Sequence, residues 1–205
     1  MTELDNNLPI FPLSGAILLP DSNLPLNIFE KKYIEMVDYS LSHNKTIGMI
    51  QTMEKGAKLY KIGCCGKITS FHTTNDGRYL INLYGVKLFR TVREIDSKKM
   101  FRIFKVEFDK KNKDKFDTDE AKFDKSLLLN KFKLFINKTN LQTSLSSIES
   151  INAKDLVKVL AMSCPFSVSE KQLLLESEDN NILADKLIVL FDFYNSHYDH
   201  KKTVN

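Results

Sequence analysis

The first half of the chain has the alternation and the proline spacing of a strand-rich protein. Closely spaced prolines forbid a helix in residues 8–13, and a second pair, Pro20 and Pro25, marks another extended run at residues 24–29. Because proline donates no hydrogen bond to a sheet, we expect both strands at sheet edges or in bulged positions. In residues 104–108 aromatic and branched side chains alternate with charged ones, which is typical of a half-buried strand.

A tight turn is predicted at Asn75-Asp76-Gly77. These residue types tolerate the left-handed backbone that a short connection between two strands requires. The flanking residues 68–73 and 78–84 are therefore predicted to pair as a hairpin. Antiparallel hairpins that keep one face in solvent favour a small curved sheet or a barrel for this half of the chain.

One short helix interrupts the strands and begins after Glu30. Its apolar residues recur at helical spacing: Tyr33, Met36, Val37 and Leu41. A polar linker follows at residues 109–116, opening on a run of Lys, Asp and Asn. Beyond it the pattern is helical, beginning with Asp117 and Glu120 in a spacing that resembles a capping box. Helical spacing then places apolar residues at Leu128, Phe132, Phe135 and Ile136.

Three further helices are predicted towards the carboxyl terminus. The first of them runs over residues 152–162 and is stopped by Pro165. The next is short and has two alternative capping pairs: Ser169 with Gln172, or Ser167 with Glu170. The last has an apolar stripe that must pack against another element: Leu183, Leu187, Leu190, Phe191 and Tyr194. The whole pattern predicts an α+β fold, with a strand-rich subdomain at residues 8–108 and a helical subdomain at residues 117–199.

Composition excludes some classes of protein. With 205 residues, 42% of them hydrophobic and 27% charged, the chain can bury a core. Its first residues are polar and acidic and no long apolar run occurs, so we expect neither secretion nor membrane spanning. The odd set of Cys64, Cys65 and Cys164 offers no disulfide framework. These observations favour a reducing cytoplasm.

The charge of the chain does not demand an anionic partner. The formal net charge is +4, and acidic residues lie between the basic ones. Arginine, which favours bidentate contacts to phosphate and guanine, supplies only four of the 30 basic residues: Arg78, Arg90, Arg93 and Arg102. This distribution argues weakly against binding of nucleic acid.

No catalytic motif is complete. Residues 63–68 resemble a phosphate-binding loop, but the two glycines are too close and Ile68 stands where a magnesium-binding hydroxyl belongs. Ser42 and Lys45 have the S-x-x-K spacing of a nucleophile and its base. The companion motifs are missing, so the end of a solvated helix explains this pair better. We therefore expect a protein that is not an enzyme.

Metal and cofactor sites have no support either. Cys64 and Cys65 with the nearby His72 do not have the C-x₂₋₄-C spacing of a structural zinc site, and residues 197–200 belong to a polar tail. Cysteines buried in a strand are the better interpretation. We expect no bound metal and no cofactor.

The first part of the chain contains a series of proline-rich motifs. It has Pro-Ile-Phe-Pro-Leu at residues 9–13, then Leu19-Pro20, then Leu-Pro-Leu-Asn-Ile-Phe-Glu-Lys-Lys-Tyr at residues 24–33. This series resembles the Lon substrate-binding domain family, which opens with P-L-F-P-L, then F-P, then L-P-L-x-I-F-E-x-R-Y. A further match to the family's G-x-x-R-F-R lies at residues 85–90. The chain departs from the family pattern at three positions: Leu19 replaces an aromatic residue, and Lys32 and Leu88 replace arginines.

The resemblance implies a fold and a function. It implies a PUA-like pseudo-β-barrel followed by an α-helical bundle, in a stand-alone member without the ATPase and peptidase of a full-length Lon protease. Such a module would bind exposed apolar segments of unfolded or client proteins, which requires an accessible apolar groove. Candidate lining residues are Phe29, Tyr33, Met36 and Tyr60. The alternative interpretation of Phe29 and Tyr33 is that they belong to the core.

Two other functions stay open at the level of sequence. PUA-like barrels elsewhere hold RNA, and lysines flank one predicted strand: Lys98, Lys99, Lys110, Lys111, Lys113 and Lys115. An adaptor that docks on a separate protease or chaperone would also need no catalytic motif. Binding of RNA should fall steeply with salt, whereas binding of an apolar peptide should not.

Overall fold

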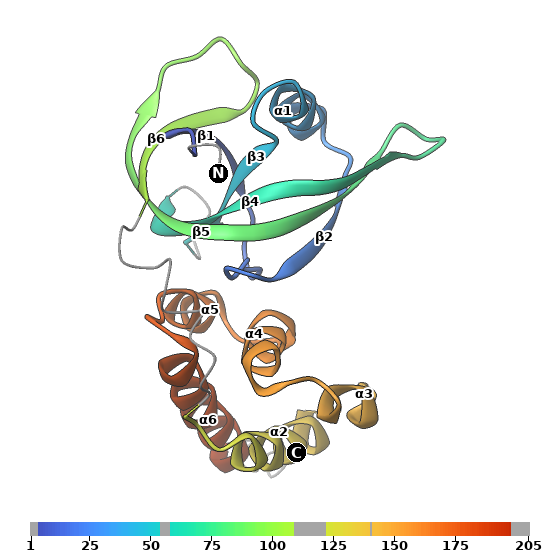
Figure 1. Ribbon diagram of the computed structural model, residues 1–205, viewed down its shortest axis with the longest axis vertical. Helices are drawn as coiled ribbons and strands as arrows, with labels where there is room; N and C mark the ends of the chain where they lie inside the picture. The colour runs from blue at the N-terminus through green and yellow to red at the C-terminus, as the bar shows by residue number, and fades with distance from the viewer. Residues whose placement is uncertain (1–3, 54–57, 109–121, 140, 198–205) are drawn as a thin grey trace, which may run out of the picture. The chain divides into compact units, whose positions relative to one another are not determined.

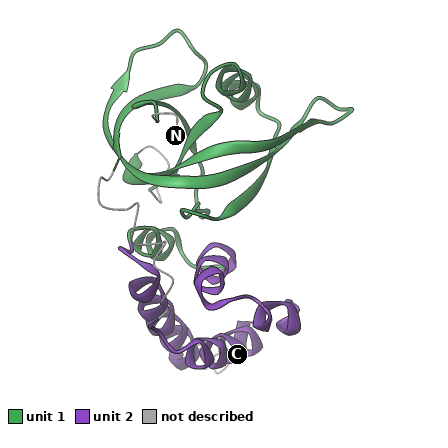
Figure 2. Ribbon diagram, in the orientation of Figure 1, with its two compact units in different colours: residues 1–114, 165–176 green, residues 115–164, 177–205 purple. Residues whose placement is uncertain are grey.

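The computed structural model of the chain describes residues 4–53, 58–108, 122–139 and 141–197 (Figure 1). The chain divides into two compact units (Figure 2). Unit 1 comprises Met1–Asp114 and Pro165–Glu176, and unit 2 comprises Lys115–Cys164 and Ser177–Asn205. The α+β class predicted from the sequence is confirmed, because strands fill the first part of the chain and helices most of the second. The predicted linker at residues 109–116 lies outside the described residues.

Unit 1 is a curved sheet with two helices. Its strands are β1 (Asn7–Pro12), β2 (Asn23–Ile28), β3 (Thr46–Thr52), β4 (Leu59–Thr73), β5 (Tyr79–Ile95) and β6 (Arg102–Phe108). Its helices are α1 (Lys31–Leu41) and α5 (Val168–Leu175). The helix expected after Glu30 is thus confirmed as α1, with Met36 and Val37 on its buried face.

The sheet closes on itself. The strand order is β2-β5-β4-β3-β1-β6, and β5 pairs with β6 as well, so that five strands form a ring and β2 is attached to β5 outside it (Figure 1). Only β1 and β3 run parallel, and the other pairs are antiparallel. The long strands β4 and β5 wrap around the barrel, which fits the pseudo-β-barrel that the resemblance implies.

The prolines show where the edge-strand prediction holds and where it fails. Strand β2, which contains Pro25, pairs only with β5 and is an edge strand as predicted. Strand β1 instead lies between β6 and β3, so the prediction is wrong for it. Its first part, through Ile10, pairs with β6, and its last part, from Ile10 on, pairs with β3. Each proline of β1 therefore lies where the strand has a partner on only one side.

The predicted hairpin is confirmed. Thr73 pairs with Tyr79 across the turn, and Gly77 takes a φ of 82°, a left-handed conformation that glycine adopts without strain. Irregularities in the register, between Cys65 and Gly66 and between Ile68 and Ser70, bend the pair as it leaves the barrel. The hairpin extends beyond α1 and β2 as an arm of unit 1 (Figure 1).

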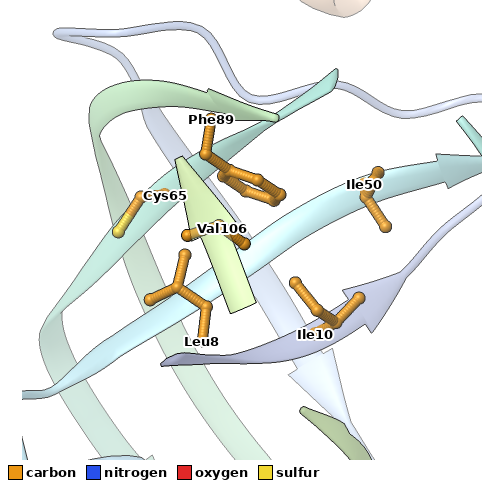
Figure 3. Close-up of a cluster of buried hydrophobic side chains, with 6 residues drawn as sticks. All are labelled: Leu8, Ile10, Ile50, Cys65, Phe89 and Val106. Carbon is orange, nitrogen blue, oxygen red and sulfur yellow. The ribbon is translucent and has the colours of Figure 1, made fainter. Parts of the chain in front are cut away.

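Phe89 fills the barrel interior. Its ring lies in a buried cluster with residues from the other four strands of the ring: Leu8, Ile10, Ile50, Cys65 and Val106 (Figure 3). Glycines on the neighbouring strands leave room for it. A Cβ added to Gly63 would lie 2.7 Å from the ring of Phe89 and 2.4 Å from the carbonyl oxygen of Met49. The glycines of the rejected phosphate-loop pattern are therefore explained by packing.

Helix α5 belongs to unit 1, which differs from the predicted helical subdomain at residues 117–199. Two buried glutamines explain the difference. The side-chain amide of Gln51 in β3 donates to the carbonyl of Val168 at 3.1 Å and to the side chain of Gln172 at 3.0 Å, and that of Gln172 donates to the carbonyl of Ile62 at 3.1 Å. The capping box of α5 uses Ser167 and Glu170, the second of the two predicted alternatives.

Unit 2 contains α2 (Lys125–Thr139), α3 (Leu145–Glu149), α4 (Ala153–Ser163) and α6 (Asn180–His197). Helix α4, capped by Asn152, and helix α6 confirm two predicted helices, whereas α3 was not predicted. Helix α2 begins later than expected. Asp124 accepts hydrogen bonds from the backbone amides of Ser126 and Leu127, whereas the predicted capping residues Asp117 and Glu120 lie outside the described residues.

The core of unit 2 lies where α6 meets α2 and α4. All four predicted core positions of α2 are buried, as are four of the five of α6. The rings of Phe132 and Phe135 pack against that of Phe191, and Tyr194 contacts Phe135 edge to face. In the described part of the chain, no helix combines the length and the apolar character needed to cross a membrane.

Candidate functional site

Exposed apolar side chains gather on the β4–β5 hairpin of unit 1. Phe71 is 41% exposed and Leu80 is 43% exposed. The rings of Phe71 and Tyr79 meet edge to face, with their centres 4.8 Å apart. Because side chains alternate along a strand, Tyr79 and Leu80 point to opposite faces. The hairpin therefore presents apolar groups on both faces. It extends beyond the barrel as an arm (Figure 1).

The end of β2 adds an aromatic residue to the same region. Ile28 pairs with Tyr79 and Asn27 pairs with Leu80, so the next residue, Phe29, follows directly at this edge of the sheet. Phe29 is 66% exposed, among the most exposed of the large apolar side chains in the described chain. We call Phe29, Phe71, Tyr79 and Leu80 the hairpin surface.

Helix α1 lies beside the hairpin surface. The pKa of the Tyr79 hydroxyl is raised above its ordinary value, first by burial and then by the carboxylate of Asp38 on α1. The ring of Tyr79 packs against that of Phe71. The aromatic pair of the hairpin therefore lies next to an acidic side chain of α1.

The turn of the hairpin is tied by its own side chains. The guanidinium of Arg78 lies 2.8 Å from the carboxylate of Asp76, and the hydroxyl of Thr74 donates to the same carboxylate. Hydrogen bonds from Arg78 and then Thr74 lower the pKa of Asp76 to about 2. The amide of Thr74 also donates to the carbonyl of Arg78 at 2.9 Å. The tip is therefore a closed hydrogen-bonded turn.

The four predicted lining residues do not form one site. Phe29 belongs to the hairpin surface. Tyr33 is partly buried, with its ring edge to face against Phe11 at 4.6 Å and Lys32 over its ring at 4.5 Å. Met36 is completely buried, so its assignment to an accessible surface is wrong in this structure. Its position faces the barrel on the inner side of α1. Tyr60 lies near the start of β4, partly buried, and forms no ring contact with Phe29 or Tyr33 among the described residues.

The hairpin surface itself was missed in the sequence, although a signal for it exists. Tyr79, Leu80 and Ile81 follow one another in a predicted strand. Since neighbouring side chains point to opposite faces, they cannot all enter one core. Ile81 is buried, and Leu80 consequently faces solvent.

Unit 2 has an exposed apolar row of its own. Ile182, Val189 and Phe193 recur along one side of α6 at helical spacing, and all three are exposed. On α2, Leu127 and Leu134 are exposed as well. Each of these two groups belongs to one helix. The hairpin surface, by contrast, combines residues of β4 and β5 with the residue that follows β2.

The residues that raised the question of catalysis have structural roles. The hydroxyl of Ser42 donates to the carbonyl of Asp38 at the end of α1, as expected for a solvated helix end. Cys64 and Cys65 are buried in β4, as predicted. Burial raises the pKa of the Cys65 thiol to about 12 and that of Cys64 well above its ordinary value. Both thiols stay protonated at neutral pH and are poor nucleophiles or ligands.

The described residues offer little to a metal ion or to RNA. Within the described ranges, no three His, Cys, Asp or Glu side chains gather as a metal site would require. Of the lysines considered for RNA binding, Lys98 and Lys99 are exposed, and Lys99 lies 5.3 Å from the centre of the Tyr39 ring. The other four, at residues 110–115, lie outside the described residues.

Comparison with known proteins gives consistent relatives. The family model described as the ATP-dependent protease La (LON) substrate-binding domain matches residues 7–192. Lon protease 1 of Bdellovibrio bacteriovorus is 24% identical over 94% of this chain and 25% of its own length. The Lon protease of Dictyoglomus thermophilum is 27% identical over 84% of this chain and 22% of its own length. The chain therefore spans about a quarter of the length of these relatives.

Solved structures show the same fold. A Lon N-terminal domain protein from Xanthomonas campestris aligns with a TM-score of 0.64 and 22% identity, over 89% of this chain and 97% of that one. The N-terminal domain of Lon protease from the Mycobacterium avium complex aligns with a TM-score of 0.61 and 14% identity, over 93% and 99%. Since the family model covers nearly the whole described chain and the fold agrees, the chain belongs to the family of LON substrate-binding domains.

Proposed function

We propose that this chain is a non-catalytic recognition module that binds exposed apolar segments of unfolded client proteins through the hairpin surface. Membership of a substrate-binding domain family supports the general role. The observation that carries the location is the exposure of Phe29, Phe71 and Leu80 on neighbouring strands, with Phe71 against Tyr79 on one face of the hairpin and Leu80 on the other. Exposed apolar groups that lie close together on a protein surface are typical of an interaction site.

The chemistry of the hairpin surface suits a partner of variable sequence. Aromatic side chains offer large apolar contact areas and tolerate many partner side chains. No charged side chain belongs to the surface, so recognition would depend on apolar burial more than on ion pairs. An arm with apolar groups on both faces can contact a flexible chain that wraps around it. Unfolded polypeptides have the required flexibility and exposed apolar residues.

We also propose that the clients are passed to an ATP-dependent protease. The relatives that match this chain are Lon proteases, and the family is named for that substrate-binding role. If the chain docks as an adaptor on a separate protease or chaperone, the hairpin surface would hold the client close to that protein. A cytoplasmic location, favoured by the cysteine content, remains a prediction.

The location is tested by measuring affinity for a permanently unfolded client. We would substitute the hairpin surface (Phe29→Ser, Phe71→Thr and Leu80→Thr) and measure binding of a reduced, carboxymethylated protein by fluorescence anisotropy. Loss of apolar contacts at the centre of a binding surface should weaken binding about tenfold or more. Threonine keeps strand propensity at the two strand positions.

A matched control removes apolar groups of similar exposure elsewhere. Val189→Gln with Phe193→Gln, on α6, should leave the affinity within about twofold of the parent protein, a change of about 0.4 kcal/mol. If the control weakened binding and the hairpin substitutions did not, the proposed location would be wrong. If neither set changed the affinity, apolar recognition by these surfaces would be refuted.

A further inference from the structure

A pocket of about 690 Å³ opens on unit 1, away from the residues of the hairpin surface. It is lined by residues 4–7, which lead into β1, and by Arg93, Ile95 and Lys105 from β5 and β6. Its volume falls within the range of small-ligand sites, and it combines polar and apolar walls. Nothing in the role of the hairpin surface accounts for this pocket.

The pairing of the strands brings two cations together in the pocket. Arg93 lies directly opposite Lys105, and Asn7 of β1 lies opposite Lys105 on its other side. The register of β5 shifts between Thr91 and Arg93, so that Val92 is an extra residue. Without that bulge Arg93 would lie opposite Phe104. Bulges redirect side chains and are common beside functional sites.

Both cations are exposed, and neither has a side-chain partner among the described residues. Neither the Arg93 nor the Lys105 side chain forms an ion pair or a hydrogen bond with another described residue. The neighbouring Arg102, by contrast, donates two hydrogen bonds to Glu94, at 2.8 and 2.7 Å. Like charges directly opposite each other on paired strands destabilise a sheet. An anion held between Arg93 and Lys105 would relieve that repulsion.

The remaining walls limit what the anion can be. Asp5 is the only carboxylate among the described lining residues, and it accepts a hydrogen bond from the backbone amide of Asn7 at 2.8 Å. The described lining thus carries two positive charges and one negative charge. Leu4 and Ile95 are partly buried and give the pocket apolar walls. The fitting ligand carries one carboxylate, which matches a guanidinium in geometry, next to an apolar group.

We propose that this pocket binds the free carboxyl-terminal residue of a polypeptide, with the carboxylate on Arg93 and Lys105 and an apolar side chain against Leu4 and Ile95. The inference rests on the proposed function, because it supplies a second contact to the same client proteins. The last residue of a polypeptide carries both required groups, and the pocket has room for it. Two contacts on one flexible chain raise the effective affinity, since the second forms within the complex.

The test uses labelled pentapeptides and the whole protein. The parent probe is fluorescein-Gly-Ser-Gly-Ala-Leu with a free carboxylate, and its partner is the same peptide ending in an amide. A third probe, fluorescein-Gly-Ser-Gly-Asp-Leu-amide, carries its carboxylate on a side chain. We expect the free acid to bind about tenfold to a hundredfold more tightly than the plain amide, as for a hydrogen bond to a charged group. The aspartate probe should bind no better than the plain amide.

Variants locate the contact. Arg93→Gln with Lys105→Gln should abolish the preference for the free acid. Lys31→Gln with Lys67→Gln removes the same charge from exposed positions outside the pocket and should leave the preference unchanged. Asp5→Asn keeps an acceptor for the Asn7 amide and should strengthen binding of the free acid about twofold, because a like charge is removed. Circular dichroism would confirm that each variant is folded.

The outcomes separate this inference from the proposed function. The pocket proposal would be overturned if the free acid bound no more tightly than the plain amide, or if the aspartate probe bound as tightly as the free acid. It would also be overturned if Asp5→Asn weakened binding of the free acid, or if the Arg93 and Lys105 variant kept the preference for the free acid. The hairpin substitutions should not change binding of the free acid. If they abolish binding of the unfolded client while the acid preference is absent, the pocket proposal alone fails. If the acid preference is present and the hairpin substitutions do not affect the client, the hairpin proposal alone fails.

Discussion

Single side chains hold the turn of the hairpin in place. Asp76 is the most strongly tied of them, because both Arg78 and Thr74 contact its carboxylate. Those contacts favour the ionised form and lower its pKa to about 2 from an ordinary value of 3.8. The turn should therefore be best ordered when Asp76 carries its charge.

This predicts a pH dependence of the hairpin tip. Because the pKa of Asp76 is lower in the folded protein, its contribution to the stability of the turn is present above pH 3.8 and is lost as the pH falls towards 2. A carbon-detected NMR titration should place the midpoint for the Asp76 carboxyl near 2. Protection of the neighbouring amides from hydrogen exchange should fall as the pH drops through this midpoint. Asp76→Asn should remove that pH dependence. A midpoint near the ordinary value would show that the turn contacts do not form.

Residue-level prediction from the sequence succeeded where one local rule decides the outcome. Gly77 follows from turn chemistry, and the burial of Cys64 and Cys65 follows from their place in an apolar strand. It failed for Met36, because helical spacing identifies the faces of a helix but does not say which residues at the edge of the buried face reach solvent. The surface role of Phe29 is still a prediction, although its exposure permits it.

At the scale of the element, the barrel depends on strands that approach closely around Phe89. Gly63 on β4 lets the backbone of β3 and the ring of Phe89 lie within van der Waals distance. A methyl group at that position would meet a backbone oxygen as well as the ring, so a side-chain movement alone cannot remove both clashes. The barrel interior is therefore sensitive to a change of one carbon atom.

Gly63→Ala should accordingly destabilise the protein. Overpacking of this kind costs about 1–3 kcal/mol, which a urea titration followed by circular dichroism would detect as a lower midpoint. Lys61→Ala, at an exposed position of the same strand, is the matched control and should change the free energy of unfolding by less than about 0.5 kcal/mol. Equal stability of Gly63→Ala and the parent protein would mean that the strands can separate without cost.

Element prediction was accurate where the signal is local and failed where it depends on distant contacts. The extended runs, the helix after Glu30 and the hairpin all follow from proline, spacing and turn chemistry. The inner place of β1 could not be predicted, because it depends on which strands pair with each half of it. The grouping of α5 with the barrel depends on Gln51 and Gln172, which are 121 residues apart and carry no pattern in the sequence.

In the whole molecule, large apolar side chains are exposed on both units, and no three potential metal ligands gather among the described residues. The family resemblance in the first part of the chain was sufficient to predict the family, and the family model extends that match through residue 192. The hairpin surface and the pocket could not be predicted in the same way. Both arise from side chains that only the closed sheet brings together.

Apolar recognition predicts weak salt dependence for an unfolded client. At 0.1 M salt, interactions between exposed charges are largely screened beyond about 10 Å. The free energy of burying apolar surface changes little over this range of salt. The dissociation constant of the unfolded client should thus vary by less than about threefold between low and moderate salt, whereas an RNA complex would weaken by orders of magnitude. Anisotropy titrations at several salt concentrations would measure this. A steep loss of affinity for the client would indicate that charge dominates its recognition.

Site-specific photocrosslinking to an unfolded client tests most directly whether clients bind at the hairpin surface. Benzoylphenylalanine would replace Phe71 on the hairpin, Tyr60 at the start of β4, or Val189 on α6, and a reduced, carboxymethylated protein would be the client. We expect strong crosslinking from position 71, which an excess of unlabelled client suppresses, and little from position 189. Crosslinking from position 189 with none from position 71 would show that clients do not bind at the hairpin surface.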